Sequence, residues 1–297
     1  MSSSPYLVGL VGQGVGPSLT PALHMAEARA NGLDYVYRTV DLTTSGIAPE
    51  RIGEVLEWAR ALGYNALNVT HPCKRLVIEH LDALDDGAAA LGAVNTVVFE
   101  PHRTVGYNTD APGFGTGFGE GLPGAATDSV TLVGAGGAGA AVGHALLDIG
   151  TEHLVIVDLD VERATALARE LANRHPGARV EASEFDKLSV LLPVSDGVVH
   201  CTPTGMADHP GLPFDAGLLH PGLWVADVVY RPLNTALLTA AREVGCQTLD
   251  GGHMAVHQAT TAFELITGIT PDAARMSRHF RSLVGEFPTV STTSEGN

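Results

Sequence analysis

The chain has 297 residues, enough for two domains, a sizeable core and a cleft between two lobes. Hydrophobic residues make up 45% of it and charged residues 17%, with no long apolar run and no low-complexity tract, which argues against a membrane-spanning or disordered protein. The formal net charge of −16, without any cluster of Lys and Arg, argues against binding to nucleic acid or to an anionic membrane.

The N-terminal segment lacks the basic stretch and the sustained apolar stretch of a secretion signal. The three cysteines, Cys73, Cys201 and Cys246, are far apart and form no Cys-x-x-Cys pair, so neither a disulfide framework nor a thiolate zinc site is indicated. We therefore expect a cytoplasmic protein.

The first third of the chain alternates strands and helices. Apolar runs predict strands over 6–11, 35–40 and 64–69, and helical spacing predicts helices over 21–31 and 49–62. Residues 93–99 and 104–107 are predicted to pair as a hairpin. A stretch rich in Gly and Pro then places the end of this α/β lobe near residue 112, before a short helix.

A second α/β pattern follows. Strands are predicted over 129–133, 153–157, 197–200, 224–229 and 246–249, with helices over 137–149, 161–173 and 234–244, as in a parallel sheet with crossover helices. Helices over 255–267 and 271–284 are expected to pack back across the first lobe, and the segment from Pro288 is expected to be disordered.

A glycine-rich motif opens the second lobe. Directly after the strand 129–133, Gly134-Ala-Gly136-Gly137-Ala138-Gly139 fits G-x-G-x-x-G and begins a helix. Gly134 permits the tight turn, Gly136 lets the backbone approach a pyrophosphate, and Gly139 lets helix and strand pack closely. A glycine-rich turn without a ligand is the alternative, but strand, glycines and helix together favour a dinucleotide site.

Asp158 ends the next predicted strand, where a carboxylate can accept hydrogen bonds from an adenosine ribose. A 2′-phosphate would place further negative charge beside Asp158, so NAD is favoured over NADP. Arg163 complicates this choice, since it can stack on the adenine or pair with Asp160. A methyltransferase that binds S-adenosylmethionine would also use a glycine-rich loop and an acid here.

Lys74 is the most distinctive residue of the first lobe. The chain has only two lysines, and Lys74 follows the predicted strand 64–69, at the kind of strand end where α/β sheets hold ligands. Asp110 and Asn95 precede the lobe boundary and add a carboxylate and an amide. A surface position for Lys74, and turn capping for the other two, are the structural alternatives.

Several ordered motifs resemble the shikimate dehydrogenase family along nearly the whole chain. They are Asn68-Val-Thr-His-Pro-Cys-Lys74, Gly92-Ala-Val-Asn-Thr96, Gly106-Tyr-Asn-Thr-Asp110, Val133-Gly-Ala-Gly-Gly-Ala-Gly139, Cys201-Thr-Pro-Thr-Gly-Met206, Asp227-Val-Val-Tyr-Arg-Pro232 and Asp250-Gly-Gly-His-Met-Ala-Val-His-Gln258. The methyltransferase alternative explains the glycines but not Lys74 or Asp110.

The resemblance implies a two-lobed enzyme that oxidises a ring hydroxyl of a cyclohexene or cyclohexane carboxylate and passes hydride to a nicotinamide. Its expected architecture is an α/β substrate-binding lobe over 1–112, a Rossmann-type NAD-binding lobe over 113–252 and returning C-terminal helices over 253–297. Lys74 and Asp110 match the catalytic pair. Implied substrate contacts are Thr70, Asn95, Tyr230 and Gln258, and implied contacts at the nicotinamide end are Thr202, Met206, Val228, Gly251 and Met254.

Two departures from the family pattern are informative. The carboxylate-binding segment, typically Ser-x-Ser-Pro, is here Ser18-Leu-Thr20-Pro21, which resembles the members that act on quinate as well as shikimate. The alternative role for Thr20 is a helix N-cap, with Pro21 at the first helical position. His200-Cys201-Thr202-Pro203 stands where Asn-Ala-Thr-Pro is usual.

His253 and His257 have the spacing of a metal pair but lack the Glu of a zinc hydrolase helix, so no metal is expected. We therefore expect an NAD-dependent oxidoreductase for quinate and shikimate, working as a monomer or homodimer on these small molecules. An NADP-dependent biosynthetic shikimate enzyme is the nearest alternative. A catalytically silent paralogue that binds a nucleotide is a further one.

Overall fold

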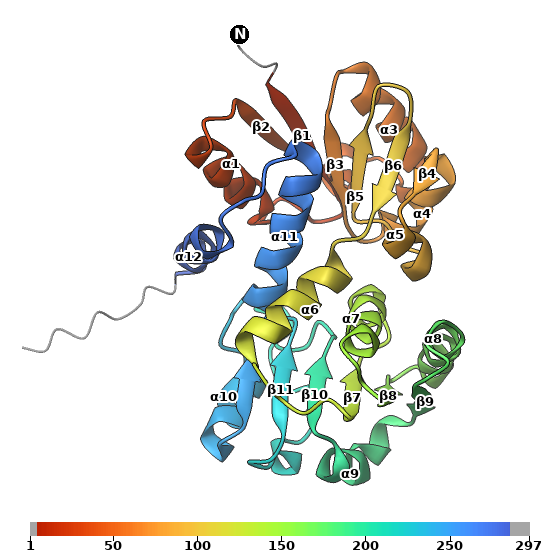
Figure 1. The fold of residues 1–297 in the computed structure, drawn as a ribbon, viewed down its shortest axis with the longest axis vertical. Helices are drawn as coiled ribbons and strands as arrows, with labels where there is room; N and C mark the ends of the chain where they lie inside the picture. The colour runs from red at the N-terminus through yellow and green to blue at the C-terminus, as the bar shows by residue number, and fades with distance from the viewer. Residues whose placement is uncertain (1–4, 286–297) are drawn as a thin grey trace, which may run out of the picture.

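The structure, a computed structural model, describes residues 5–285 and is built around two six-stranded sheets. Figure 1 shows one sheet above the other, with two helices, α6 and α11, running between them. Within residues 5–285, no helix combines the length and the apolar character needed to cross a membrane. The expected disorder from Pro288 onward concerns residues outside the described part.

The first sheet is mixed and has the strand order β2-β1-β3-β5-β6-β4. β1 is parallel to β2 and β3, whereas β5 is antiparallel to β3 and β6, so the expected hairpin is confirmed. The strands are β1 (Tyr6–Gly12), β2 (Tyr35–Asp41), β3 (Ala66–Val69), β4 (Ala83–Leu84), β5 (Thr96–Phe99) and β6 (Thr104–Tyr107).

The helices of this lobe follow the apolar spacing of the sequence. In α3, Ile52, Val55, Leu56 and Ala59 are buried on one face, and a 3₁₀ turn, Pro49–Arg51, precedes the helix. β4 and the short α4 and α5 were not predicted, because each is too short for its apolar residues to show a helix or strand period. The helices are α1 (Thr20–Ala30), α2 (Leu42–Ser45), α3 (Ile52–Ala61), α4 (Cys73–Leu76) and α5 (Asp86–Leu91), with a 3₁₀ segment, Val77–His80.

The second sheet is parallel throughout and has the order β12-β11-β10-β7-β8-β9. Its central strands are buried on both faces, which explains their continuous apolar runs. The edge strand β9 (Arg179–Ser183) has polar residues and was missed. The other strands are β7 (Ser129–Val133), β8 (His153–Val157), β10 (Gly197–His200), β11 (Trp224–Asp227) and β12 (Gln247–Leu249), and the helices are α7 (Gly137–Asp148), α8 (Val161–Arg174), α9 (Leu188–Leu191) and α10 (Ala236–Val244).

Helices α6 (Asp110–Gly121) and α11 (Gly251–Thr267) pack against each other between the sheets. Glycines on α6 make this approach possible, because a Cβ at Gly113 would lie 2.7 Å from the Gln258 backbone nitrogen. At Gly117 a Cβ would lie 3.0 Å from the His253 Cβ. The glycine-rich stretch therefore forms a full helix rather than a loop and a short helix.

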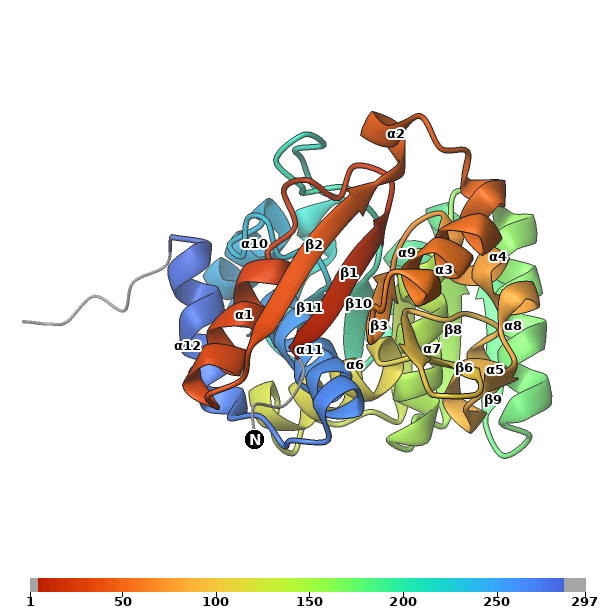
Figure 2. The same cartoon turned by 90° about the horizontal axis from the view of Figure 1, so that it is seen from above.

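The last helices return to the first lobe, as expected. α12 (Ala273–Leu283) lies beside α1 in Figures 1 and 2. Arg275 donates two hydrogen bonds to the fully buried Glu27 carboxylate of α1, at 2.6 and 2.8 Å. We propose to divide the chain after residues 112 and 252, as the sequence suggests.

Candidate active site

The loops after β1 and β3 pack together at one edge of the first sheet. Gln13 N donates to His71 O at 3.0 Å, and Thr70 N donates to Val11 O at 2.9 Å. A Cβ at Gly12 would collide with Thr70 Cγ2. Since both strands run the same way, their carboxyl ends bring Thr70 and the loop that leads to Ser18 to one edge.

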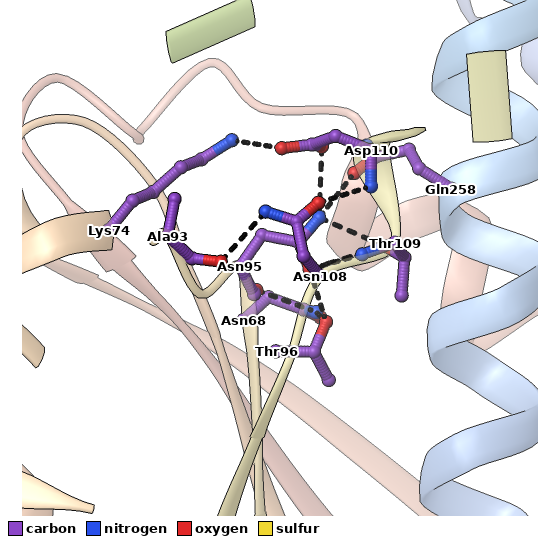
Figure 3. A network of polar contacts seen from close by, with 9 residues as sticks. All are labelled: Asn68, Lys74, Ala93, Asn95, Thr96, Asn108, Thr109, Asp110 and Gln258. Atoms are coloured by element: carbon purple, nitrogen blue, oxygen red, sulfur yellow. Dashed lines mark hydrogen bonds and ion pairs between the residues drawn. The ribbon is translucent and has the colours of Figure 1, made fainter. Parts of the chain in front are cut away.

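Lys74 and Asp110 form an ion pair at this edge. Lys74 lies in α4, and Asp110 is the first residue of α6, where a negative charge interacts favourably with the helix dipole. Lys74 Nζ donates to Asp110 Oδ2 at 2.5 Å, as Figure 3 shows. The Lys74 side chain is 25% exposed and that of Asp110 only 7%, so the lysine is the member that solvent or a ligand can reach.

A buried network orients the Asp110 carboxylate. Asn95 Nδ2 donates to Asp110 Oδ1 at 2.9 Å, and Asn95 Oδ1 accepts from Thr109 N at 3.0 Å. The turn itself is capped by Asn108, whose Oδ1 accepts from Asp110 N at 2.9 Å and whose Nδ2 donates to Ala93 O at 2.9 Å. Asn95 therefore bonds the carboxylate in addition to the backbone of the turn before α6.

Gln258 of α11 reaches the same network, since Asn95 Nδ2 lies 3.5 Å from Gln258 Oε1. Sequence reasoning missed Asn68 and Thr96, which bond to each other at 2.9 Å beneath Asn95. Both stand inside motifs already singled out for Lys74 and Asn95. Their signal was a polar side chain within an otherwise apolar strand.

The segment of Ser18 and Thr20 begins α1 differently from expectation. The N-cap is Leu19, whose side chain makes no capping hydrogen bond, so the N-cap role of Thr20 is wrong. Leu19 already has helical backbone angles, which moves the helix start and places Thr20 inside the first turn. Ser18 Oγ instead donates to Thr20 Oγ1 at 3.2 Å.

A hydrogen bond ties this segment to the second lobe. Arg231, in the loop after β11, donates through Nη1 to Pro17 O at 2.7 Å. Its neighbour Tyr230 packs on Phe280 with ring centroids 5.9 Å apart. The loop that carries Tyr230 and Arg231 therefore contacts both α12 and the segment that leads to Ser18.

The glycine-rich loop after β7 fits a dinucleotide. Gly134 has a φ of +110°, which favours glycine, whereas Gly136 has ordinary angles and Gly137 follows it. A Cβ at Gly136 or Gly137 would meet nothing within 4 Å, and no side chain caps α7. Open space therefore faces uncapped helix amides, including that of Ala138, which suits a pyrophosphate.

Gly139 supplies the close helix–strand packing that the motif predicts. A Cβ at this position would collide with the Gly134 carbonyl oxygen. Gly134 itself packs against the start of the loop after β10, where a Cβ would lie 2.9 Å from Thr202 Cγ2. The loops after β7 and β10 therefore meet at the edge of the sheet.

Asp158 anchors the glycine-rich loop at the end of β8. Its Oδ2 accepts from Ala135 N at 2.7 Å, and its Oδ1 accepts from Asp160 N at 2.9 Å and from Arg163 Nη2 at 2.6 Å. Burial alone would raise the pKa of the Asp158 carboxyl, but these hydrogen bonds, with that of Arg163 foremost, hold the pKa below its ordinary value. The Arg163 guanidinium thus pairs with Asp158, whereas the Arg163 backbone amide donates to the Asp160 side chain at 3.1 Å.

The other expected cofactor residues lie around the ends of β10 and β11. Thr202 Oγ1 lies 2.5 Å from Nε2 of the buried His200. A Cβ at Gly251 would collide with Val228 O, so the start of α11 lies directly on the loop after β11. Met254 packs against the core beneath α6, and Met206 is 38% exposed in the loop after β10.

The two histidines of α11 have separate surroundings. His257 Nε2 lies 2.9 Å from Glu120 Oε2 of α6, and the packing of α6 on α11 places His253 against Gly117. Burial lowers the pKa of His253. Among residues 5–285, no group of three or more His, Cys, Asp or Glu side chains could hold a metal ion.

Comparisons with known proteins match both lobes. Residues 10–97 match the profile described as shikimate dehydrogenase substrate binding domain, and residues 120–207 match that described as shikimate / quinate 5-dehydrogenase. The chain belongs to the shikimate dehydrogenase family. It is therefore an oxidoreductase of the shikimate/quinate dehydrogenase type that uses a nicotinamide dinucleotide.

Individual members of the family are similar along almost their full length. The NADP(+) shikimate dehydrogenase of Streptomyces avermitilis is 57% identical over 96% of this chain and 98% of its own. The NAD(+) quinate/shikimate dehydrogenase of Corynebacterium glutamicum is 48% identical over 93% and 98%. A quinate dehydrogenase from Corynebacterium glutamicum, solved in complex with NAD, superposes with a TM-score of 0.88 at 47% identity over 94% and 99%.

Proposed function

We propose that this shikimate dehydrogenase family member is an NAD-dependent quinate/shikimate dehydrogenase, with Lys74 and Asp110 as its catalytic pair. The single observation that carries the proposal is the 2.5 Å contact between Lys74 Nζ and Asp110 Oδ2 at the start of the helix that runs between the two sheets. The relatives named for quinate and shikimate support the substrate class.

The pair can remove the proton that must leave a secondary alcohol as it is oxidised. Lys74 in its neutral form accepts this proton at Nζ, and Asp110 holds the lysine in place through Oδ2. Asn95 keeps the carboxylate from rotating because it bonds the other oxygen. The nicotinamide, when bound, supplies the hydride acceptor.

The remaining candidate residues would orient the ring. Thr70, Asn95 and Gln258 offer a hydroxyl and two amides for the ring hydroxyls near Lys74. Ser18 and Thr20 offer two hydroxyls for the substrate carboxylate, and Tyr230 would close this side of the site. The hydrogen bond from Arg231 to Pro17 supports the arrangement, because it brings the Tyr230 loop against the Ser18 segment.

NAD is proposed as the preferred cofactor because of Asp158. A carboxylate has room for about four hydrogen bonds, and the loop amides and Arg163 use three. The remaining lone pair can accept a ribose hydroxyl, whereas a 2′-phosphate would be repelled. The half-exposed Arg163 supports NADP as the second candidate, since its guanidinium could bind a phosphate instead, and a relative named for NADP is 57% identical.

The test is a set of initial rates of nicotinamide reduction, with quinate and shikimate each combined with NAD and NADP. Turnover of quinate and shikimate with NAD, with NADP slower, is expected. Lys74→Ala is expected to lose about 100- to 10,000-fold in kcat while the folded fraction and the binding of NAD stay unchanged. Activity with shikimate and NADP alone would replace the proposal with the biosynthetic alternative.

A further inference from the structure

The network that holds Asp110 does not stop at Asn95 but continues through the sheet to Tyr37 of β2. Tyr37 OH donates to Asn68 Oδ1 at 2.6 Å, and Asn68 Nδ2 donates to Thr96 Oγ1 at 2.9 Å. Thr96 Oγ1 donates to Asn95 Oδ1 at 3.0 Å, and Asn95 Nδ2 donates to Asp110 Oδ1. Four hydrogen bonds thus join Tyr37 to the carboxylate that binds Lys74.

The register of the first sheet explains why these side chains meet. Tyr37 pairs with Val8, and Val8 pairs with Ala66, so all three face one side of the sheet. Asn68 lies two residues beyond Ala66 and faces the same side. Asn68 also pairs directly with Thr96 across the antiparallel contact. Tyr37 therefore reaches across β1 to Asn68, and Figure 3 shows Asn68 and Thr96 below Asn95.

The groups at the Asp110 end determine which atom donates and which accepts in every hydrogen bond of the series. Asp110 as a carboxylate only accepts, and the Thr109 amide only donates, so Asn95 must present Nδ2 to Asp110 and Oδ1 to Thr109 and Thr96. Thr96 uses its single proton on Asn95 and must accept from Asn68. Asn68 Oδ1 must then accept a hydrogen bond. Among the contacts of the described residues, the Tyr37 hydroxyl is the only donor to this oxygen.

We infer that Tyr37 is a positioning residue, which acts on the catalytic pair through Asn68, Thr96 and Asn95 without touching the substrate. The inference rests on the proposed function of Lys74 and Asp110. Asn95 also bonds Thr109 and approaches Gln258, so a loose Asn95 would disturb the carboxylate and the substrate amides together. Tyr37 supplies the terminal donor that keeps Asn68 and Thr96 in one arrangement.

Tyr37 is well held for this task. It is 4% exposed and lies in an aromatic cluster formed by Tyr6, His24, Tyr35, Tyr37 and Phe263. The His24 ring of α1 meets the Tyr37 ring edge-on, with centroids 5.2 Å apart. Burial raises the pKa of the Tyr37 phenol well above its ordinary value, so it stays a donor at every working pH.

Tyr35 offers a matched control on the same strand and in the same cluster. Its hydroxyl lies 3.2 Å from His24 Nδ1 and has no bond to the series that ends at Asp110. Tyr37→Phe and Tyr35→Phe each remove one buried or half-buried hydroxyl and keep the ring. We expect Tyr37→Phe to lower kcat about fivefold, the effect of one neutral hydrogen bond, with the KM for NAD unchanged. Tyr35→Phe is expected to stay within about twofold of the wild type.

Thr96→Val interrupts the same series on another strand. If Tyr37→Phe fails to fold, a kcat of Thr96→Val within twofold of the wild type overturns the inference, because Tyr37 reaches Asp110 only through Thr96 in this series. Its expected loss in kcat is at least that of Tyr37→Phe. The double variant should lose no more than Thr96→Val alone, because a broken series cannot be broken again. If Tyr37 and Thr96 only stabilise the fold independently, the fold-losses in kcat of the two single variants should multiply in the double variant, because independent free-energy changes add.

Each outcome separates this inference from the function on which it rests. Equal kcat values for Tyr37→Phe and Tyr35→Phe, or multiplied losses in the double variant, overturn the role of Tyr37 while the wild-type activity and the Lys74→Ala loss stand. A wild type that turns over neither quinate nor shikimate overturns the proposed function, and the inference about Tyr37 with it.

Discussion

Replacing Asp158 by Asn is the change that most directly probes the cofactor site. The amide oxygen of the new side chain can still accept from Ala135 N, so the glycine-rich loop keeps its anchor, but the negative charge at the proposed ribose site is removed. Arg163 is about half exposed, and loss of its pair with Asp158 should cost at most about 1 kcal/mol of unfolding free energy.

The effect on cofactor choice should be larger. At a separation of about 5 Å and an effective dielectric constant of about 40, a phosphate of charge about −1.5 is repelled by a carboxylate by about 2.5 kcal/mol. This energy corresponds to a factor of about 70 in affinity. Without the carboxylate, Arg163 is also released to bind a 2′-phosphate.

The measurement is the ratio of kcat/KM for NAD to that for NADP, with quinate held at saturation. Asp158→Asn should move this ratio toward NADP by about 30- to 100-fold. Asp160→Asn is the matched control, because Asp160 is exposed and caps α8, and Asn caps helices equally well. A ratio that Asp158→Asn leaves within threefold of the wild type would refute the electrostatic reasoning.

Two further predictions concern stability. Gly113→Ala would press its Cβ to 2.7 Å from the Gln258 nitrogen, so it should lower the unfolding free energy by about 1 to 3 kcal/mol, whereas Gly119→Ala on the same helix meets nothing within 4 Å and should stabilise. Urea unfolding that ranks the two variants the other way would contradict the α6–α11 contact. Burial lowers the pKa of His24 to about 3, and the unfolded chain takes up a proton near pH 6.5. The contribution of His24 is therefore fully present above about pH 6.5 and is lost as the pH falls toward 3, by about 2 kcal/mol between pH 8 and 5. His24→Phe should remove that part of the pH dependence and the exposed His102→Gln should keep it; equal slopes for the two would be inconsistent with a buried neutral imidazole.

Much of the fold could be predicted because its signals are local. The strands β7, β8 and β10 have the predicted bounds, since a strand buried on both faces is a continuous apolar run ended by Gly, Asp or His. β9 was missed because polar residues interrupt the apolar ones along this edge strand, so its sequence contains no continuous apolar run. The glycine-rich segment of α6 was predicted as a lobe boundary followed by a short helix, because glycine has a poor helix propensity. The packing that offsets this propensity comes from α11, which lies far along the chain.

The candidate site follows the same division. Lys74, Asp110 and the glycine-rich loop stand out in the sequence, because their chemistry and spacing are written in short motifs. The N-cap role of Thr20 was wrong, and the Arg163 guanidinium pairs with Asp158 rather than with Asp160. Neighbouring positions compete for such side-chain contacts, and the backbone geometry decides between them.

The sequence by itself determined two α/β lobes and a glycine-rich loop, and its motifs suggested candidate residues for a dehydrogenase site, because periodicity, glycine positions and motif chemistry are properties of short stretches. Only the tertiary structure decided that Asp158 is held by Arg163 and the loop, and that Tyr37 connects to Asp110 through three strands. Such contacts join residues distant in the chain, and strand register and helix packing alone bring them within hydrogen-bond distance.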